Sequence, residues 1–454
     1  MTRAPSAPPS WEERLPLLVP VLVKERSPEL GAALDRLDSA RGYLHWDEVR
    51  HRPPPPGWDV RDLWTLARFE RSAAARELPL LRQKDGRPFT LSKSDPMEAA
   101  LHRIDTSETI WKQLLGKRET PGSEVTYQLM AAIEEAHHSS AIEDAVTTRR
   151  QSRELLRSGR QPRDDSERMV WNNFQISERL EEWIDAPLTP ERICEIQATA
   201  TAGTLKRSED VGSIRTQDDV FVLDTQSSDV VYVPPSASEL PGRLDRICEF
   251  ANGESSDELF LHPVVRAILL HHQLAYDHPF ADGNGRTARA LFLWSILRSG
   301  YSWFRSLSIS RAVHRARARY YRSFLYVQSD AGDVTYFVRQ QMSCIEHEIE
   351  RLAAFLERRA QLERWLLEKQ AVAEGLNARQ LALVEHALAH PEAAFTAGEH
   401  ARYHGVTQPT AWKDLKTLSE MGLLKETKSG RKSIYRPSGK LRALTEERAG
   451  MVGR

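Results

Sequence analysis

Cysteine and long apolar stretches are both scarce in this chain of 454 residues. The three cysteines, Cys194, Cys248 and Cys344, lie far apart and form no CxxC pair, which argues against a disulfide framework. The longest apolar run, Leu15 to Val23, contains two prolines and is too short to cross a bilayer. The first residues also lack the apolar segment of a secretory signal. We therefore expect a protein of the reducing cytoplasm that does not enter a membrane.

An excess of charge of one sign is missing as well. The formal net charge is -1, although 28% of the residues are charged. Nothing in this balance attracts the whole molecule to nucleic acid or to an acidic membrane, so any such attraction requires a local patch. The apolar content of 40% is ordinary for a globular protein, and the length predicts two or three domains.

Helical periodicity is what the sequence has in abundance, so we predict a mainly α fold. Apolar side chains recur at spacings of three or four in most segments after the proline run 53–56 and the polar break at 84–96. The expected helices cover residues 123–157, 165–184 and 189–202, a stretch beginning at 258, and a long charged helix from 334 to 373. Strands are expected only in a hairpin within residues 212–235 and in the tail.

The segment HPFADGNGRTAR, residues 278–289, gathers groups that suit phosphate-ester chemistry. It follows one amphipathic helix and opens another, so its glycines can turn backbone N–H groups toward an anion at a helix N-terminus. Arg286 and Arg289 suit phosphate oxygens, and Asp282 is a hard oxygen ligand suited to Mg²⁺. His278 is a candidate general base. A turn with a structural histidine would explain single residues of this set, but not their combination.

The segment resembles the Fic signature HxFx(D/E)GNGRxxR and matches it at every defined position. This resemblance implies a bundle of helices with one β-hairpin flap. It also implies an adenylyltransferase that moves AMP from ATP to a Ser, Thr or Tyr hydroxyl of a protein. By position, His278 would deprotonate the hydroxyl and Asp282 would hold Mg²⁺. The groups implied to bind ATP phosphates are Gly283, Asn284, Gly285, Arg286 and Arg289.

A second stretch resembles the inhibitory helix of Fic proteins, with the pattern (S/T)xxxE(G/N). Ser139 and Glu143 match this pattern, whereas Asp144 stands where Gly or Asn is usual. The resemblance implies that Glu143 pairs with Arg289 and keeps the ATP triphosphate from aligning. An ordinary cap at Ser139 and a surface charge at Glu143 are the alternative interpretation.

Two further matches concern substrates. The hairpin at 212–235 resembles the flap that binds an extended stretch of the protein target by strand addition. Tyr320, Tyr321 and Gln328 fit positions that line the adenine side in relatives, although adjacent tyrosines are also common in cores.

The tail predicts three helices and two strands, an order typical of a winged helix-turn-helix. Lys425, Lys428, Arg431, Lys432 and Arg436 lie in its expected wing. Such a wing can bind DNA, but Glu420 and Glu426 dilute the patch, and winged helices also bind proteins or form homodimers. We favour the protein-contact interpretation over DNA.

These patterns together predict five parts. They are an N-terminal helical region for target or dimer contacts (1–122), a Fic catalytic domain with the inhibitory helix (123–341), a linking helix (342–375), a winged helix domain (376–440) and a tail (441–454). The favoured function is an autoinhibited adenylyltransferase with ATP and Mg²⁺. The alternatives are a nucleotide-sensing DNA-binding regulator with little turnover, and a Fic enzyme that removes AMP.

Overall fold

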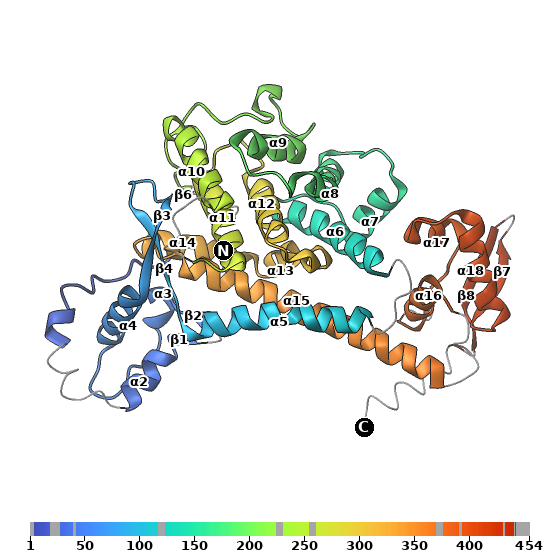
Figure 1. Cartoon of the computed structure of the whole chain (residues 1–454), viewed down its shortest axis with the longest axis horizontal. Coiled ribbons are helices and arrows are strands. Elements are labelled where there is room, and N and C mark those ends of the chain that lie inside the picture. The colour runs from blue at the N-terminus through green and yellow to red at the C-terminus, as the bar shows by residue number, and fades with distance from the viewer. Residues whose placement is uncertain are drawn as a thin grey trace. The chain divides into compact units, whose positions relative to one another are not determined.

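The computed structural model of the chain is mainly helical (Figure 1). It describes residues 4–18, 28–39, 42–116, 123–223, 230–253, 260–368, 376–389, 393–429, 432–439 and 441. Within these residues the strands form four sheets of two antiparallel strands each. The chain divides into two compact units. The first comprises residues 1–108, 131–152 and 162–349, and the second comprises 109–130, 153–161 and 350–454.

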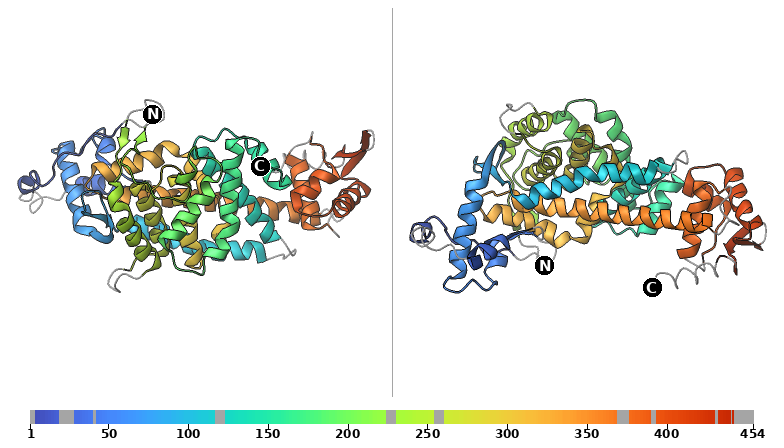
Figure 2. Two further views of the ribbon diagram at one scale, coloured as in Figure 1. Left: turned by 90° about the horizontal axis from the view of Figure 1, so that it is seen from above. Right: turned by 60° about the horizontal axis from the view of Figure 1, so that its bottom comes forward.

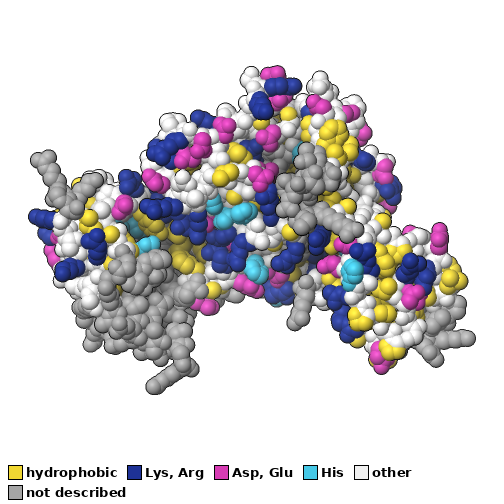
Figure 3. All heavy atoms as spheres, turned by 180° about the vertical axis from the view of Figure 1, so that it is seen from behind, with side chains coloured by type: hydrophobic (Ala, Val, Ile, Leu, Met, Phe, Trp, Pro, Cys, Tyr) yellow, Lys and Arg dark blue, Asp and Glu magenta, His cyan; other side chains and the backbone are white. Residues whose placement is uncertain are grey.

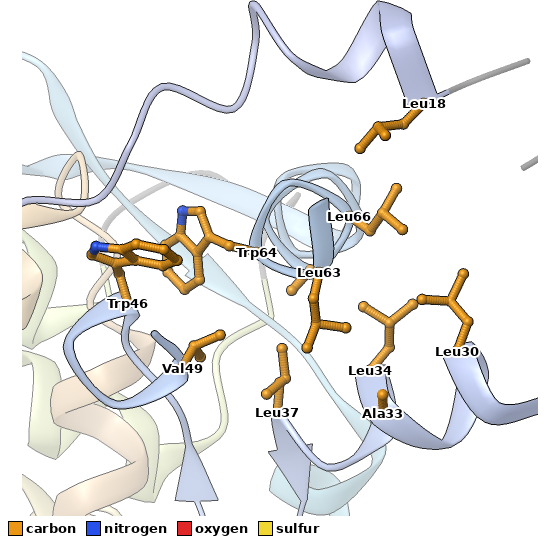
Figure 4. Close-up of a cluster of buried hydrophobic side chains, with 11 residues drawn as sticks. Leu18, Leu30, Ala33, Leu34, Leu37, Trp46, Val49, Leu63, Trp64 and Leu66 are labelled. Carbon is orange, nitrogen blue, oxygen red and sulfur yellow. The ribbon is translucent and has the colours of Figure 1, made fainter. Parts of the chain in front are cut away.

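The N-terminal part of the first unit has its own apolar cluster. Its elements are α2 (Pro28–Asp35), β1 (Asp38–Ser39), β2 (Gly42–Tyr43), α3 (Trp46–Val49), α4 (Val60–Ala74), β3 (Ala75–Arg82) and β4 (Pro88–Ser92). Asp59 caps α4 and Asp62 returns the contact in a capping box, which fixes where this helix begins. Figure 4 shows Trp46 and Trp64 close together beside Val49, while Leu63, Leu34 and Leu37 meet below α4. The tryptophans on either side of the proline run 53–56 thus have a structural role, because they pack in this cluster.

Two hairpins in this part were not expected from the sequence. β1 pairs with β2, and β3 pairs with β4 across a segment that we expected to be a polar break. Phe89 and Leu91 of β4 are buried, and Thr90 exchanges backbone hydrogen bonds with Gly332 and Val334. The expectation of strands only in the flap and the tail is therefore wrong. β4 forms because two alternate apolar residues make contacts with segments far away in the sequence. Such contacts cannot be predicted from a short window of sequence.

The centre of the first unit is a helical bundle built around α11 (Pro263–Asp277) and α12 (Asn284–Arg298), which pack against each other. Most residues of both helices are buried, so they form the core that holds the loop between them. The surrounding helices are α6 (Ser123–Ile142), α8 (Asp165–Trp183), α9 (Pro190–Thr201), α10 (Leu240–Asn252), α13 (Ile309–Arg315) and α14 (Arg317–Ser329). Short 3-10 turns occur at Ser208–Asp210, Ala237–Glu239 and Ser302–Ser306.

Three long helices, α6 among them, and a short one connect the units along the chain. α5 (Asp95–Gly116) and α15 (Thr335–Glu368) run side by side (Figure 2), and Arg103 of α5 pairs with Glu346 of α15 at 2.7 Å. α7 (Arg149–Ser158) follows the turn after α6, so the expectation of continuous helix over residues 123–157 is wrong: the helix is interrupted at residues 143–148. The long helix expected from 334 to 373 is present to Glu368, and residues 369–375 lie outside the described part.

The expected flap is a short antiparallel hairpin of β5 (Val222–Leu223) and β6 (Val230–Tyr232). Its polar tip, residues 224–229, lies outside the described residues. Phe221, Val230 and Val233 remain exposed on and beside the strands. A hairpin with apolar side chains turned to solvent suits contact with another chain.

In the second unit, the tail has the expected order of elements. α16 (Ala378–Ala389), α17 (Ala397–His404) and α18 (Gln408–Glu420) precede the antiparallel strands β7 (Leu424–Ser429) and β8 (Lys432–Pro437). Leu383, Val384, Leu415, Leu418 and Tyr435 form a core of their own. The name winged helix remains an interpretation of this order.

Charges of both signs are spread over the face drawn in Figure 3, as the near-zero net charge leads one to expect. Among the described helices, none is both long enough and apolar enough to cross a bilayer.

Candidate active site

The site begins with the unusual backbone of the loop between α11 and α12. His278 ends α11 in the left-handed region with φ 49°, and Gly283 precedes α12 with φ 83°. A Cβ at position 283 would lie 2.6 Å from Thr201 Cγ2, so glycine is required there for space as well as for conformation. A strained histidine held at a helix end is typical of a residue that is positioned for function.

Asn284 fixes the shape of this loop. Its Oδ1 accepts a hydrogen bond from the Phe280 N–H at 3.0 Å, and its Nδ2 donates to the Phe280 carbonyl at 2.8 Å. The Phe280 side chain is fully buried and anchors the turn in the core. Both polar ends of the Asn284 side chain are thus used inside the protein, and what this residue can offer an anion is its backbone N–H.

The N-terminus of α12 has no side-chain cap. Gly283 caps the helix without any side-chain hydrogen bond, and the first N–H groups of a helix have no partner within the helix. The missing Cβ of Gly285 makes this end accessible: a Cβ there would lie 2.2 Å from Glu143 Oε1. The Glu143 carboxylate therefore lies directly against the helix end where a phosphate would bind.

Arg289 joins the segment that carries Ser139 and Glu143 to α12. Its Nη2 donates to Glu143 Oε1 at 2.8 Å and to the Ser139 carbonyl at 3.0 Å, and its Nε donates to Ser139 Oγ at 3.0 Å. Burial lowers the pKa of Arg289, but the Glu143 carboxylate, together with Tyr320 and Tyr321, raises the pKa above its usual value. Nη1 is buried without a hydrogen-bond partner among the described residues. The predicted contact between Glu143 and Arg289 is present.

Asp144 departs from the family pattern, and its backbone conformation explains why Asp is accepted at this position. It adopts φ 62°, in the left-handed region where Gly and Asn are favoured and where Asp is tolerated better than most residues. Its side chain forms an ion pair with Arg317 at 2.8 Å, and the Arg317 guanidinium lies 5.6 Å from the centre of the Tyr321 ring. The substitution thus keeps the turn and adds a contact to α14.

Asp282 and Arg286 lie at the other side of the loop. The Asp282 carboxylate is half-exposed, accepts a hydrogen bond from the Gly283 N–H at 2.5 Å, and pairs with Arg286 Nη2 at 3.2 Å. Arg286 is buried and donates from Nη1 to the Ala200 carbonyl of α9 at 2.8 Å. In this arrangement Arg286 orients Asp282 and holds α9. Arg286 and Arg289 therefore do not point toward a common position.

His278 is arranged to accept a proton. Its Nδ1 lies 3.2 Å from the Ala275 carbonyl, a contact that requires the proton on Nδ1 and leaves Nε2 as the basic nitrogen. Burial lowers the pKa of His278 below its usual value, while the Ala275 carbonyl and the Glu143 charge act in the opposite direction. The imidazole is therefore neutral at neutral pH, as a general base requires.

The tyrosines expected on the adenine side lie next to the segment that carries Glu143. Tyr320 is buried, and its hydroxyl lies 3.0 Å from His271 Nε2. The Tyr321 hydroxyl lies 3.5 Å from the Ile142 carbonyl. Gln328 is half-buried two turns further along α14, where its side chain makes none of the described hydrogen bonds.

Two positioning residues were missed or undervalued in the sequence. Arg215 ties the base of the flap to the loop by donating to the carbonyls of His278 and Pro235. Gln197 of α9 donates to the Asp282 carbonyl at 3.0 Å and accepts from the Gly212 N–H at 2.6 Å. Nothing distinguishes Gln197 from a surface glutamine in the sequence, because its burial depends on distant elements.

The structure thus defines a helical bundle in which the Glu143 carboxylate lies against the loop between α11 and α12. Comparison with known proteins gives this class a name: residues 187–296, which include the whole loop, match the model of the Fic/DOC family. Ser139, Glu143, Tyr320, Tyr321 and Gln328 lie outside the matched segment. The chain therefore contains a segment of the Fic type that carries the His278-to-Arg289 motif.

Curated relatives are similar over a limited part of the chain. The protein adenylyltransferase Fic of Drosophila willistoni is 37% identical over 115 residues, which is 25% of this chain and 21% of that protein. The protein of the same name from Culex quinquefasciatus is 34% identical over 119 residues, 26% of this chain and 22% of its own length. The chain spans about a fifth of the length of these relatives.

A solved structure is similar over a larger share of the chain. The crystal structure of a Fic family protein from Desulfovibrio desulfuricans covers 77% of this chain and 97% of its own, with a TM-score of 0.51 and 18% identity. At this identity the likeness concerns the fold alone.

Proposed function

We propose that this protein transfers AMP from ATP to a hydroxyl side chain of a protein and that Glu143 holds it in an inhibited state. The observation that supports the proposal best is the Glu143 carboxylate, which lies at the open N-terminus of α12 and pairs with Arg289. A negative group at this point occupies the place of a phosphate and takes the guanidinium that a phosphate would need.

In the proposed reaction, His278 Nε2 takes the proton of the hydroxyl as its oxygen attacks the α-phosphorus of ATP. The bond from the α-phosphorus to the oxygen bridging the β-phosphorus breaks, and pyrophosphate leaves. The N-terminal N–H groups of α12 bind phosphate oxygens, and Arg289 binds the terminal phosphates once Glu143 withdraws. The target strand would add to the flap, where Phe221, Val230 and Val233 are exposed.

The residues present fit a Mg²⁺ ion. Asp282 offers a half-exposed carboxylate at the edge of the proposed phosphate site, and magnesium is commonly held by one or two carboxylates together with substrate phosphates. When bound, the ion would neutralise phosphate charge and favour pyrophosphate as a leaving group. Arg286 and the Gly283 N–H keep the Asp282 carboxylate oriented for that role.

The test compares Glu143→Gly with the unaltered chain, each incubated with ATP and Mg²⁺ and analysed by intact mass and by label transfer to lysate proteins. A buried ion pair can hold a few kcal/mol and each 1.4 kcal/mol is about tenfold in rate, so we expect at least about a tenfold gain. Glu143→Gln should give a smaller gain, because it keeps the bulk of the side chain and removes only the charge.

The matched control is Glu143→Gly combined with His278→Ala, which should transfer no AMP. If Glu143→Gly adds no AMP unit to itself or to any lysate protein, the transferase proposal fails and the nucleotide-sensing regulator takes its place. If Glu143→Gly and the unaltered chain transfer at equal rates while His278→Ala abolishes transfer, the active site stands and the inhibition proposal fails.

A further inference from the structure

A second concave site lies on the other side of α14 from the candidate active site. It is a cavity of about 410 Å³ within the first unit, a size typical of small-molecule sites. Its walls come from β2, α3, the start of α5, the α13–α14 junction and the start of α15. Tyr320 and Tyr321 do not line it, whereas Arg319, Arg322, Ser323 and Tyr326 of the same helix do.

The cavity contains more arginine than its acidic residues neutralise. Five arginines line it: Arg103, Arg315, Arg319, Arg322 and Arg339. Of the three lining carboxylates, Glu346 pairs with Arg103 and Glu348 pairs with Arg311, while Glu48 pairs with no base that the structure describes. Within the described part of the chain, Arg315, Arg319 and Arg322 likewise have no carboxylate partner at ion-pair distance.

The positions of these arginines are unfavourable without a negative partner. Arg319 lies in the first turn of α14, which has no acidic residue there and no side-chain cap. Cations at that end of a helix oppose its dipole, and Arg319 and Arg322 repel each other because they are three residues apart on one face. The same N-terminus of α14 would attract an anion.

Two buried polar atoms of the cavity also lack partners. The Tyr326 hydroxyl and Arg339 Nη1 are inaccessible to solvent and have no hydrogen-bond partner among the described residues. Buried polar groups are nearly always satisfied, so each of these atoms needs an explanation. Because water reaches neither atom, a ligand in the cavity would bond with them only after a small shift of these side chains.

From this geometry we propose that the cavity binds a phosphate-bearing small molecule of about nucleotide size. Arginine is well suited to phosphate oxygens because its guanidinium presents paired donors. Tyr43, Tyr336, Met342 and Ala100 give the cavity an apolar side as well, which suits a ligand that carries an organic group beside its phosphate. The proposal holds whether or not the protein transfers AMP, because none of the candidate active-site residues lines this cavity.

The test uses inorganic pyrophosphate as the probe and isothermal titration calorimetry as the measurement, on the full chain. Glu143 holds the Arg289 guanidinium in the unaltered chain, and any pyrophosphate that displaces it would bind equally in all the variants, so the number of sites is the decisive readout. The double variant Arg319→Gln with Arg322→Gln should bind one pyrophosphate fewer per chain than the unaltered protein. Arg61→Gln, an exposed arginine of α4 with no described acidic partner, is the matched control and should bind the same number.

Thermal unfolding of the same proteins checks the fold. Without phosphate the double variant should melt at the same temperature as the unaltered chain or higher, because two repelling charges are removed. Arg319→Gln alone, at an exposed position, serves if the double variant fails to fold. An unchanged number of sites and an unchanged affinity in these variants would overturn the proposal. It is equally overturned if a poly-glutamate peptide binds the cavity and pyrophosphate does not.

Discussion

At the scale of single residues, the environment of His278 predicts how the reaction depends on pH. Burial holds the pKa of this imidazole below 6.5, its usual value, and the Glu143 charge partly offsets that shift. A lowered pKa keeps the base neutral down to a lower pH, so transfer should decline only below pH 6.5. Removing the Glu143 charge should lower the pKa further and move the acidic limb of the rate profile to still lower pH.

The measurement is the rate of label transfer against pH for Glu143→Gly and Glu143→Gln at saturating ATP. Both variants lack the negative charge, so their acidic limbs should coincide although their maximal rates differ. A limb well above pH 6.5 in both variants would show that the base is not a buried neutral imidazole. This would remove His278 from the role of general base.

At the level of single residues, the sequence was a good guide to which side chains lie in contact. It was a poorer guide to which hydrogen bonds those side chains make. The contact of Glu143 with Arg289 was expected from the resemblance and is present. The side chain of Asn284 was expected to face phosphate, yet it is committed to the Phe280 backbone, because the sharp loop leaves these groups no other partner. Such a choice between internal and external partners depends on loop geometry, which spacing alone does not contain.

At the scale of elements, the sequence was reliable where one periodic pattern persists over many residues. α8, α9 and α15 begin within a residue or two of their expected positions, since each has a clear cap or a long apolar stripe. β3 and β4 were missed because their strands are short and their burial depends on the segment near Gly332, far away in sequence. Local propensity rarely decides such strands.

The turn after α6 contacts the start of α14, and this contact between two elements can be tested. Asp144 and Arg317 join the turn that follows Glu143 to the helix that carries Tyr321. The Asp144 side chain is 64% exposed, so this ion pair is worth at most about 1 kcal/mol. Arg317→Ala should therefore raise the transfer rate of the chain with Glu143 intact by no more than about fivefold, well below the effect of Glu143→Gly.

Asp144→Asn is the matched variant, because Asn tolerates the same left-handed backbone and removes only the charge. It should reproduce the gain of Arg317→Ala, and the two changes combined should add nothing further. Neither change should alter the rate of Glu143→Gly, since the turn has then lost its inhibitory side chain. Additive gains from the two variants would contradict a shared contact.

At the scale of the whole molecule, the tail from residue 376 onward carries its own apolar core and no candidate active-site residue. Within the second unit it touches the helices that flank the inhibitory turn. Arg157 of α7 lies over the Tyr403 ring of α17 at 3.8 Å, and the Tyr403 hydroxyl lies 3.9 Å from Met130 Sδ of α6. The tail can therefore influence how firmly α6 and α7 are held without taking part in the chemistry.

The last prediction separates these two roles of the tail. In the Glu143→Gly background, a chain that ends at Gly375 should transfer AMP within about twofold of the full chain, since every proposed catalytic group remains. With Glu143 intact, Tyr403→Ala should raise the rate about two- to fivefold, because a cation–π contact of about 0.5–1 kcal/mol no longer supports the inhibitory segment. Label transfer under matched ATP and Mg²⁺ measures both arms, and Tyr403→Phe, which keeps the ring, is the control. A loss of more than tenfold in the truncated Glu143→Gly chain would mean that the tail supplies something that the site itself requires.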